Sequence, residues 1–479
     1  MESIWQKTSQ AGSRPQLEGD ITADVAVIGG GLAGVLTAHF LSEAGKDVVI
    51  LEANRVGSGQ TGRTTAKVTA QHGLCYAEML RQQGESTARA YAAANQQAVT
   101  LYRRLIDRLS IQCGFTEAPS WLYTCLETAP LEEELAAYEA LGLKGALARD
   151  TGLPFPVTAA LRLDGQAMFH PLKFLRRIAA PLRIYEHTRV LSVEGGVLAT
   201  AKGAVHAQKV VFACHFPFLN HPGYYFMRMH QERSYCIAVE GAALPEGMFL
   251  GIDTDGLSLR PAGKYVLVGG GSHRTGENRK GGQLDMLESR AKRIWRGCSV
   301  AARWSAQDCV SLDGIPYIGQ FAADTPDWFV ATGFRKWGMT GSMAAARVLT
   351  ALVQGEPAEF GGLFTPQRFQ PSASAAQLFH DMAESVRGLS RTAFGLPRGL
   401  TDALPAGHGG IVSYEGGKAG VYKSPSGEIF VIDPRCPHLG CQLEWNPDTL
   451  SWECPCHGSR FDFRGRLLDG PAQRDAERG

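Results

Sequence analysis

Apolar and polar positions between residues 24 and 52 follow the pattern of a strand, a tight turn, a helix and a second strand. A short apolar run, Val25 to Ile28, is followed at once by glycines. Apolar residues then recur with helical spacing until Gly45, which places them on one face of a helix. A second β-branched run ends at Glu52. This order predicts a β-strand that leads into a helix through a glycine turn.

Further along the chain, helical and strand-like segments follow one another. Residues 76–141 are rich in Ala, Glu, Gln and Leu and poor in glycine, which predicts mostly helix. Residues 184–213 alternate between apolar and polar positions and predict strands joined by turns. Residues 220–315 have a mixed pattern, and a helix is expected at 341–355, closed by its terminal glycine.

The character of the chain changes after residue 355. Residues 356–404 combine a Pro- and Gly-rich stretch with one helical stretch, AAQLFHDMAESVRGLS, and predict a linker with a helix. Short apolar runs separated by glycine turns then predict a small all-β module over residues 405–479.

Length and composition are those of an ordinary globular protein. The 479 residues are too many for one hydrophobic core, so two or three domains are expected. The net charge of +1 gives no attraction to nucleic acid, and no nucleic-acid partner is expected. No run of eighteen apolar residues occurs, which predicts no transmembrane segment. The start of the chain lacks an apolar core behind a basic end, so we predict a cytoplasmic protein without a secretory signal.

The glycines after the first strand fit a nucleotide-binding turn. Gly29, Gly31 and Gly34 have the spacing G-x-G-x-x-G. In this motif the backbone approaches a pyrophosphate, and the N–H groups of the following helix face the phosphates. Glu52, at the end of the next strand, is placed to bind ribose hydroxyls and disfavours a 2′-phosphate, so NADP is not expected. The alternative is a glycine-rich turn without function, and the motif alone does not separate FAD from NAD.

Three further segments separate these two cofactors by resemblance. SGQTGRTTAKVTAQHG (58–73), DGIPYIG (313–319) and VATGFRKWGMT (330–340) resemble the flavin-contacting segments of the D-amino-acid oxidase family. The resemblance implies an oxidoreductase that binds FAD and oxidises C–N bonds. It also implies an α/β, Rossmann-like FAD-binding domain and an α+β substrate domain with an antiparallel sheet.

The domain boundaries follow from the same likeness. The oxidoreductase unit is expected at residues 22–355, with a substrate-domain part at about 219–307. The FAD-binding parts are expected at about 22–90, 150–218 and 308–355.

The likeness also implies which residues contact the flavin. One group should line the FAD: Arg55, Thr61, Arg63, Thr64 and Thr65. A second group should approach the isoalloxazine ring: Gly333, Gly338, Met339 and Thr340. A helix that begins near Gly341 would direct its positive end toward the flavin pyrimidine ring, where reduction accumulates negative charge. The alternative is a simple loop before a helix.

The cysteines are distributed unevenly. Seven of the eleven are spread singly, as is usual for buried small hydrophobic residues. The other four lie within 21 residues near the C-terminus: Cys436, Cys441, Cys454 and Cys456. Such a group in a cytosolic protein indicates a metal. With His438 and His457 the segment forms C-x-H and C-x-x-H motifs, and two cysteines with two histidines could in principle bind one zinc ion.

The full strings CPHLGC and CPCHGS resemble the Rieske [2Fe-2S] domain. In a Rieske centre two thiolates bind one iron and two imidazoles bind the other. The resemblance implies the ligands Cys436, His438, Cys454 and His457, a disulfide between Cys441 and Cys456, and a covering loop at residues 470–471. Rieske oxygenases use the same cluster, but they also need a mononuclear iron held by two histidines and a carboxylate. No suitable histidine pair occurs in the sequence.

Together these resemblances imply a flavin-dependent oxidoreductase that oxidises an amine or amino acid by hydride transfer to FAD. A [2Fe-2S] cluster would then pass single electrons to an unknown one-electron acceptor. The alternative is an electron-transfer component or redox sensor without a small-amine substrate of its own.

The catalytic residues are not identified by any motif. Arg260 is a candidate clamp for a substrate carboxylate, and Arg228 and Arg233 are others. His72 lies close to the flavin segment and could face the ring, and His170 is a similar candidate. Each has an ordinary alternative, a surface or ion-paired arginine or a structural histidine.

Overall fold

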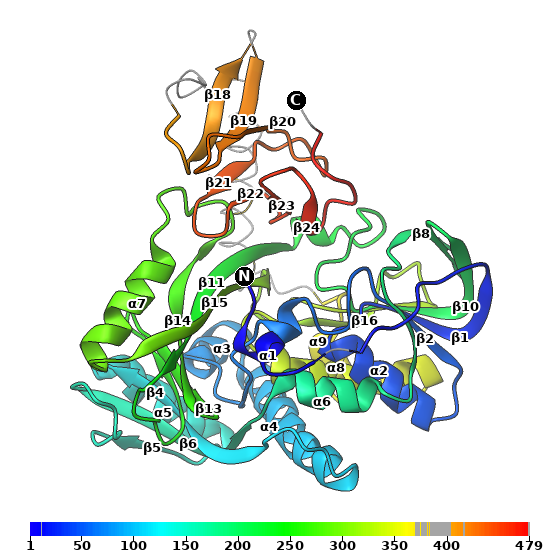
Figure 1. The fold of residues 1–479 in the computed structure, drawn as a ribbon. Coiled ribbons are helices and arrows are strands. Elements are labelled where there is room, and N and C mark those ends of the chain that lie inside the picture. The colour runs from blue at the N-terminus through cyan, green and yellow to red at the C-terminus, as the bar shows by residue number, and fades with distance from the viewer. Residues whose placement is uncertain are drawn as a thin grey trace.

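The structure is a computed structural model with three parts (Figure 1). It describes residues 1–10, 12–368, 374, 381, 383, 404–414 and 417–477. The helix expected at AAQLFHDMAESVRGLS lies outside the described residues, apart from Asp381 and Ala383. None of the helices in the described ranges combines the length and the apolar character that crossing a membrane requires.

The first part is built on an eight-stranded sheet. Its order is β16 (Tyr317–Gln320), β17 (Trp328–Thr332), β10 (Gly203–Phe212), β1 (Ile21–Ile28), β2 (Val48–Leu51) and β7 (Arg183–Tyr185), with β8 (Val190–Glu194) and β9 (Val197–Thr200) beside β10. β1 runs parallel to β2 and β10, and all residues of β2 are buried, as expected of a parallel sheet that is covered on both faces. The helices α2 (Leu32–Glu43) and α8 (Gly338–Gln354) pack on each other and on this sheet. The predicted strand, glycine turn, helix and strand are confirmed.

The second part is a nine-stranded, mostly antiparallel sheet. Its order is β15 (Ser299–Ser311), β11 (Met229–Glu240), β14 (Tyr265–Arg274), β13 (Ser258–Ala262), β12 (Met248–Gly251), β4 (Thr116–Thr124), β6 (Ala159–Met168) and β3 (Lys67–Val68), with β5 (Gly145–Ala148) beside β6. The sheet therefore extends beyond residues 219–307, the segment expected to form it. β12 pairs with β4 in parallel, so strands that are far apart in the sequence belong to one sheet.

Helices surround both sheets. They are α1 (Ile4–Lys7), α3 (Cys75–Gln83), α4 (Glu85–Arg108), α5 (Ala129–Leu141), α6 (Pro171–Ala179), α7 (Gln283–Ile294) and α9 (Gly361–Phe364), together with the short turns Gln60–Gly62 and Tyr225–Met227. The region 76–141 is mostly helical as predicted, and β4 is the strand that interrupts it. There the buried residues 120–124 pair with β6 and β12, and this pairing outweighs the helical composition of the flanking sequence.

The third part, orange to red in Figure 1, is all-β as predicted. One sheet contains β18 (Gly409–Tyr414), β19 (Gly417–Lys423) and β20 (Ile429–Ile432), and the other contains β21 (Glu444–Asn446), β22 (Ser451–Glu453), β23 (Arg460–Asp462) and β24 (Leu467–Asp469). In its core Tyr422 stacks on Trp445, and Trp445 has an edge contact with Trp452. The part lies over the end of β11 in the second sheet (Figure 1).

Replacing Gly34 by alanine tests the packing of the glycine turn. A Cβ atom at Gly34 would lie 2.0 Å from the backbone oxygen of Gly29, which cannot move without opening the turn. We expect Gly34→Ala to lower the free energy of unfolding by about 1–3 kcal/mol, the usual cost of overpacking. Thermal unfolding measures this, with Gly362→Ala in α9 as the control, since nothing lies within 4 Å of a Cβ there. An unchanged Tm for Gly34→Ala would mean that α2 can move away from β1.

Candidate functional site

A cavity of about 410 Å³ is lined by residues of all three parts. Most of the residues expected at FAD line it: Gly29, Gly31, Glu52, Thr61, Arg63, Thr64, Thr65, Gly333, Gly338 and Met339. Gly34, Arg55 and Thr340 are not among the lining residues in the described part of the chain. Segments that range from residue 29 to residue 473 therefore meet around one cavity. The loop after β24 is one of these segments.

The glycine turn fits a dinucleotide. Gly29 has φ +113°, and a Cβ atom there would lie 2.4 Å from the backbone oxygen of Ala213. Gly31 is the N-cap of α2 and has no side chain to satisfy the helix N–H groups, so the start of the helix is open to the cavity. The hydroxyl of Thr61 accepts a hydrogen bond from the amide of Leu32 at 3.0 Å. These features leave backbone donors and space where a pyrophosphate would bind.

Glu52 lies at the end of β2, beside the turn. Its two carboxylate oxygens accept hydrogen bonds from the amides of Gly30 and Asn54, each at 2.7 Å. Burial raises the pKa of Glu52, and the two amides act in the opposite direction. The carboxylate is thus oriented by the turn and still lines the cavity, as a ribose-binding acid requires.

The loop from Gly333 to Met339 forms another wall. Gly333 has φ +73°, and the amide of Arg335 donates to the Cys309 oxygen at 2.8 Å. The backbone oxygen of Met339 accepts a hydrogen bond from the Tyr102 hydroxyl at 2.8 Å. The loop is held from both sides immediately before α8, so the N-terminal end of this helix has a fixed direction at the cavity.

His72 lies behind this loop. Its ring stacks on the cavity-lining Trp337 at 4.6 Å, and its nitrogens contact the Tyr91 hydroxyl at 2.8 Å and the Thr69 oxygen at 2.8 Å. Burial lowers the pKa of His72 to about 3, so the ring is neutral. Thr340 lies 3.1 Å from the same ring through its hydroxyl. These contacts favour a positioning role for His72, which supports Trp337.

Arg260, like His72, contacts a segment that forms the cavity wall. Its guanidinium donates to the backbone oxygens of Thr65 and Ala66 at 2.9 and 2.6 Å and lies over the Trp5 ring. Burial lowers the pKa of Arg260 to about 9. The arrangement favours a role in holding the flavin segment and gives no support to a carboxylate clamp.

The other three candidates also have structural partners. Arg228 lies over the rings of Tyr225 and Tyr317. Arg233 is fully buried with its Nε atom 3.5 Å from Glu453. His170 caps α6 and contacts the Thr8 hydroxyl at 3.1 Å.

Several charged residues that line the cavity were not predicted from the sequence, and Lys67 and Asp308 are two of them. Lys67 donates to the Phe249 oxygen at 2.5 Å and to the Ser258 hydroxyl at 2.7 Å, and burial lowers its pKa to about 7. Asp308 lines the cavity from β15. Lys67 lies within the segment 58–73 that resembles a flavin-contacting segment, although it was not singled out there, and no motif marks Asp308.

The two cysteine-rich loops form a second site. Cys436 and Cys454 are buried, and their thiols lie close enough to share a hydrogen bond. The rings of His438 and His457 lie 4.9 Å apart, and the Nδ1 atoms of both are buried without a hydrogen-bond partner in the described residues. Burial lowers the pKa of His438 to about 4 and that of His457 to about 3, so both imidazoles are neutral, as metal ligands must be.

This donor set fits a two-iron cluster better than one zinc ion. In the described part of the chain, the group of ligand atoms that lie within 4.8 Å of one another consists of the sulfurs of Cys441, Cys454 and Cys456. Two of these three, Cys441 and Cys456, form a disulfide. The remaining thiols and the two partnerless Nδ1 atoms are spread more widely, as ligands of two different irons are.

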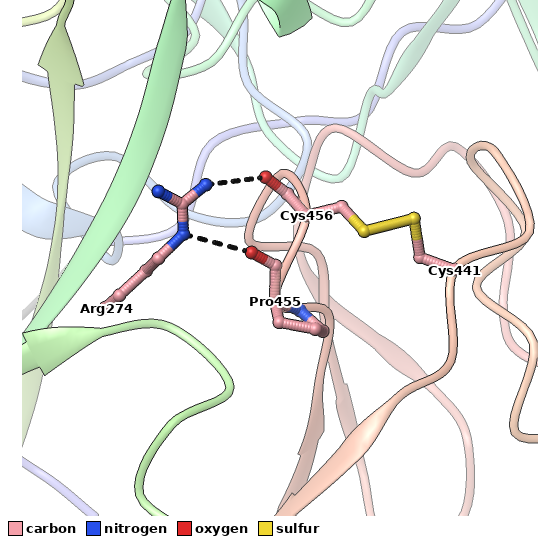
Figure 2. The surroundings of a disulfide bond; sticks show 4 residues. All are labelled: Arg274, Cys441, Pro455 and Cys456. Carbon is pink, nitrogen blue, oxygen red and sulfur yellow. Dashed lines mark hydrogen bonds between the residues drawn. A yellow bond between two sulfur atoms is a disulfide. The ribbon is translucent and has the colours of Figure 1, made fainter. Parts of the chain in front are cut away.

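The disulfide ties the two cluster loops together at the boundary with the second sheet (Figure 2). Arg274, at the end of β14, donates through Nε to the Pro455 oxygen at 3.2 Å and through Nη2 to the Cys456 oxygen at 3.3 Å. The same guanidinium forms an ion pair with Asp381. The loop that contains Cys454 is therefore held by a covalent bond on one side and by an arginine of the second sheet on the other.

The histidine side of the second site also faces the rest of the chain. The Nε2 atom of His438 lies 2.8 Å from the Asn220 Oδ1 atom. Both histidine rings have edge contacts with Phe226, at 5.9 and 5.5 Å. Gln231 donates to the His457 oxygen at 2.7 Å and to the Gly470 oxygen at 3.0 Å. Residues that precede and begin β11 thus cover the histidine side.

Comparisons with known proteins agree with this geometry. A family model described as FAD dependent oxidoreductase matches residues 24–352, and one described as Rieske [2Fe-2S] domain matches residues 398–477. The chain is 36% identical to the putative Rieske 2Fe-2S iron-sulfur protein YhfW of Bacillus subtilis, over 98% of this chain and 96% of that protein.

Two other known proteins are similar to only part of this chain. Gamma-glutamylputrescine oxidoreductase of Escherichia coli is 30% identical over 41% of this chain and 50% of that protein. The crystal structure of glycine oxidase from Geobacillus kaustophilus superposes with a TM-score of 0.63 at 20% identity and covers 73% of this chain and 99% of that chain, which shows a shared fold.

Removing the disulfide tests its role at the cluster loops. The two cysteines are 15 residues apart, and closing such a loop stabilises a folded unit by about 3 kcal/mol. We expect the double variant Cys441→Ser/Cys456→Ser to lose iron and visible absorbance at a lower temperature than the parent chain. Cys125→Ser, which removes an exposed free thiol, is the control and should behave like the parent. Equal retention of iron in the double variant would show that the remaining contacts hold the loops.

Proposed function

The chain belongs to the FAD dependent oxidoreductase family and ends in a Rieske [2Fe-2S] domain, and from this premise we propose that it oxidises a C–N bond of an amine or amino acid. FAD supplies the acceptor for a hydride and two electrons, and the cluster supplies a carrier that takes electrons singly. The names of two similar proteins, gamma-glutamylputrescine oxidoreductase and glycine oxidase, support an amine or amino-acid substrate. A cytoplasmic location stays a prediction.

The observation that carries the proposal is the shared cavity. Leu468, Asp469 and Gly470 belong to the Rieske domain, and they line the same cavity as the glycine turn and the loop at 333–339. The carboxylate of Asp469 is paired with Arg460 at 2.6 Å, which holds the pKa of Asp469 at about 2 against the effect of burial. A wall of the candidate FAD site is thus built from the domain that carries the candidate cluster ligands, which supports electron transfer within one chain.

Each group of residues has a role in this proposal. The turn at Gly29 and Gly31, with Glu52, would bind the dinucleotide, and the loop before α8 would orient the ring. Cys436, Cys454, His438 and His457 would hold the irons through the thiols and the Nδ1 atoms. His72 and Arg260 would keep the cavity wall in place and exclude water.

Anaerobic titration with amines and amino acids tests the proposal. We expect at least one compound to bleach the visible absorbance of the oxidised flavin, and the EPR signal of the reduced cluster then to grow without added partner. An electron-transfer component would be reduced only by a protein partner or NAD(P)H. Flavin bleaching with a cluster that stays oxidised would contradict transfer within the chain, and the absence of an iron signal after dithionite would contradict the cluster assignment.

Weakening the contact between the Rieske domain and the second sheet should separate flavin reduction from electron transfer to the cluster. Arg274→Met leaves the oxygens of Pro455 and Cys456 without this donor, at a cost of about 1–3 kcal/mol to the contact. We expect slower growth of the EPR signal at an unchanged rate of flavin bleaching. Arg290→Met is the matched control, because that arginine lies on the surface of α7 and bonds the Asp255 oxygen. Identical kinetics in the Arg274 variant would mean that this contact does not set the transfer rate.

A further inference from the structure

Three carboxyl groups line the cavity, and two of them are already engaged. Glu52 accepts two backbone amides, and Asp469 is paired with Arg460. The third is Asp308 on β15. Among the described residues, no hydrogen bond or ion pair engages the Asp308 carboxylate. It is therefore the acid in this cavity that is free to bind a ligand.

The cations near Asp308 are occupied elsewhere. Glu232 lies directly opposite Asp308 across the β11–β15 pair, so both side chains are on one face of the sheet. Lys336 is bound to Glu232 at 3.2 Å and to the Ser272 hydroxyl at 2.9 Å. Arg233 belongs to the opposite face, where it meets Glu453 at 3.5 Å. Arg63, Lys67 and Arg189 also line the cavity, and no ion pair joins any of them to Asp308 among the described residues.

Arg335 is the remaining cation of the neighbouring loop. Its charge acts on His72 and Tyr91, behind Trp337, and its guanidinium lies next to Gly314. Arg335 also lines the cavity, but no ion pair joins it to Asp308 among the described residues. Burial, assisted by Glu232 and opposed by Lys336 and Arg233, raises the pKa of Asp308 to about 7.

Asp308 is also close to the place where the reaction would occur. The next residue, Cys309, accepts the Arg335 amide at 2.8 Å, which fixes Asp308 beside the loop expected at the isoalloxazine ring. Several neighbouring residues of the wall are small and leave space for a ligand: Ser234, Gly269, Gly270, Ser272 and Ala306. A small molecule bound here would lie between Asp308 and the flavin loop.

We propose that Asp308 binds the protonated nitrogen of the substrate and takes one proton from it. This inference rests on the proposed function and makes its substrate class more specific. One N–H bond breaks and one O–H bond forms, so the step needs no oxidant, and it leaves the neutral amine, the form that bound FAD would oxidise.

The same charges select among amines. An α-carboxylate on the substrate would lie next to Asp308 and Glu232 and would be repelled by both. Amines without an α-carboxylate should therefore bind more tightly than the corresponding α-amino acids. The preferred substrate class is a simple amine that is cationic at neutral pH.

Ligand binding to the flavin-loaded, full-length chain tests the inference. Two matched pairs serve as probes, pyrrolidine with L-proline and putrescine with L-ornithine, and the absorbance of the oxidised flavin reports binding. We expect the amine of each pair to bind more tightly, with an affinity that increases as pH rises through about 7 and Asp308 loses its proton. Asp308→Asn should weaken amine binding about tenfold or more, the scale of one hydrogen bond to a charged group, and abolish this pH dependence.

Two further variants complete the experiment. Asp308→Glu keeps the charge and should restore part of the affinity, which guards against an Asn variant that is merely misfolded. Glu240→Gln is the control on β11, because Glu240 is paired with Lys264 at the surface, and its affinities should match the parent. Unchanged amine affinity in Asp308→Asn, or tighter binding of the α-amino acids, would overturn the inference.

Anaerobic flavin bleaching by the same amines separates the two proposals. Equal bleaching rates and pH profiles for the parent and Asp308→Asn would overturn the role of Asp308 and leave the proposed function intact. If no amine bleaches the parent although amine binding depends on Asp308, the cation site stands and the proposed oxidation fails.

Discussion

The contact between the Rieske domain and the second sheet depends on a chain of buried charges. Arg233 on β11 has no exposed surface, and its Nε atom lies 3.5 Å from the equally buried Glu453 of β22. Glu453 is also 3.2 Å from Arg460, which in turn binds Asp469 at 2.6 Å. Burial lowers the pKa of Arg233 to about 10, whereas the acids around Arg460 raise its pKa. Removing charges from water is costly, so a register that pairs these four groups is favoured over one that leaves a buried charge unpaired.

The way in which these charges pair the Rieske domain with the second sheet also sets the composition of one cavity wall. Asp469 ends the charge chain and also lines the cavity, so the pairing that fixes the Rieske domain also builds a wall of the candidate FAD site. Gln231 and Gln307 extend the contact by donating to the His457 and Gly458 oxygens at 2.7 and 2.8 Å. Hydrogen bonds and ion pairs between protein groups thus hold the candidate cluster ligands in position relative to the flavin segments. None of these contacts involves a cofactor.

The strands β11 and β15 serve both sites because side chains alternate between the faces of a sheet. Arg233 and Gln307 point toward the Rieske domain, and their neighbours Ser234 and Asp308 line the cavity. The alternation is not strict, because Tyr235 and Cys309 also line the cavity. A sheet with one face toward each site allows the two sites to lie close together.

The sequence by itself determined the features that lie within a few consecutive residues. The G-x-G-x-x-G turn, Glu52, the two cysteine-histidine motifs and the all-β character of the C-terminal part are local patterns, and backbone sterics or ligand chemistry explains each of them. Tertiary structure decided the rest. β4 is a strand because β6 and β12 flank it, Arg260 is drawn to the carbonyls of residues 65 and 66, and Asp308 reaches the cavity through pairing with residue 232. These outcomes depend on partners that are far away in the chain. A local pattern does not show which distant residue will pair with a strand or form an ion pair or hydrogen bond with a side chain.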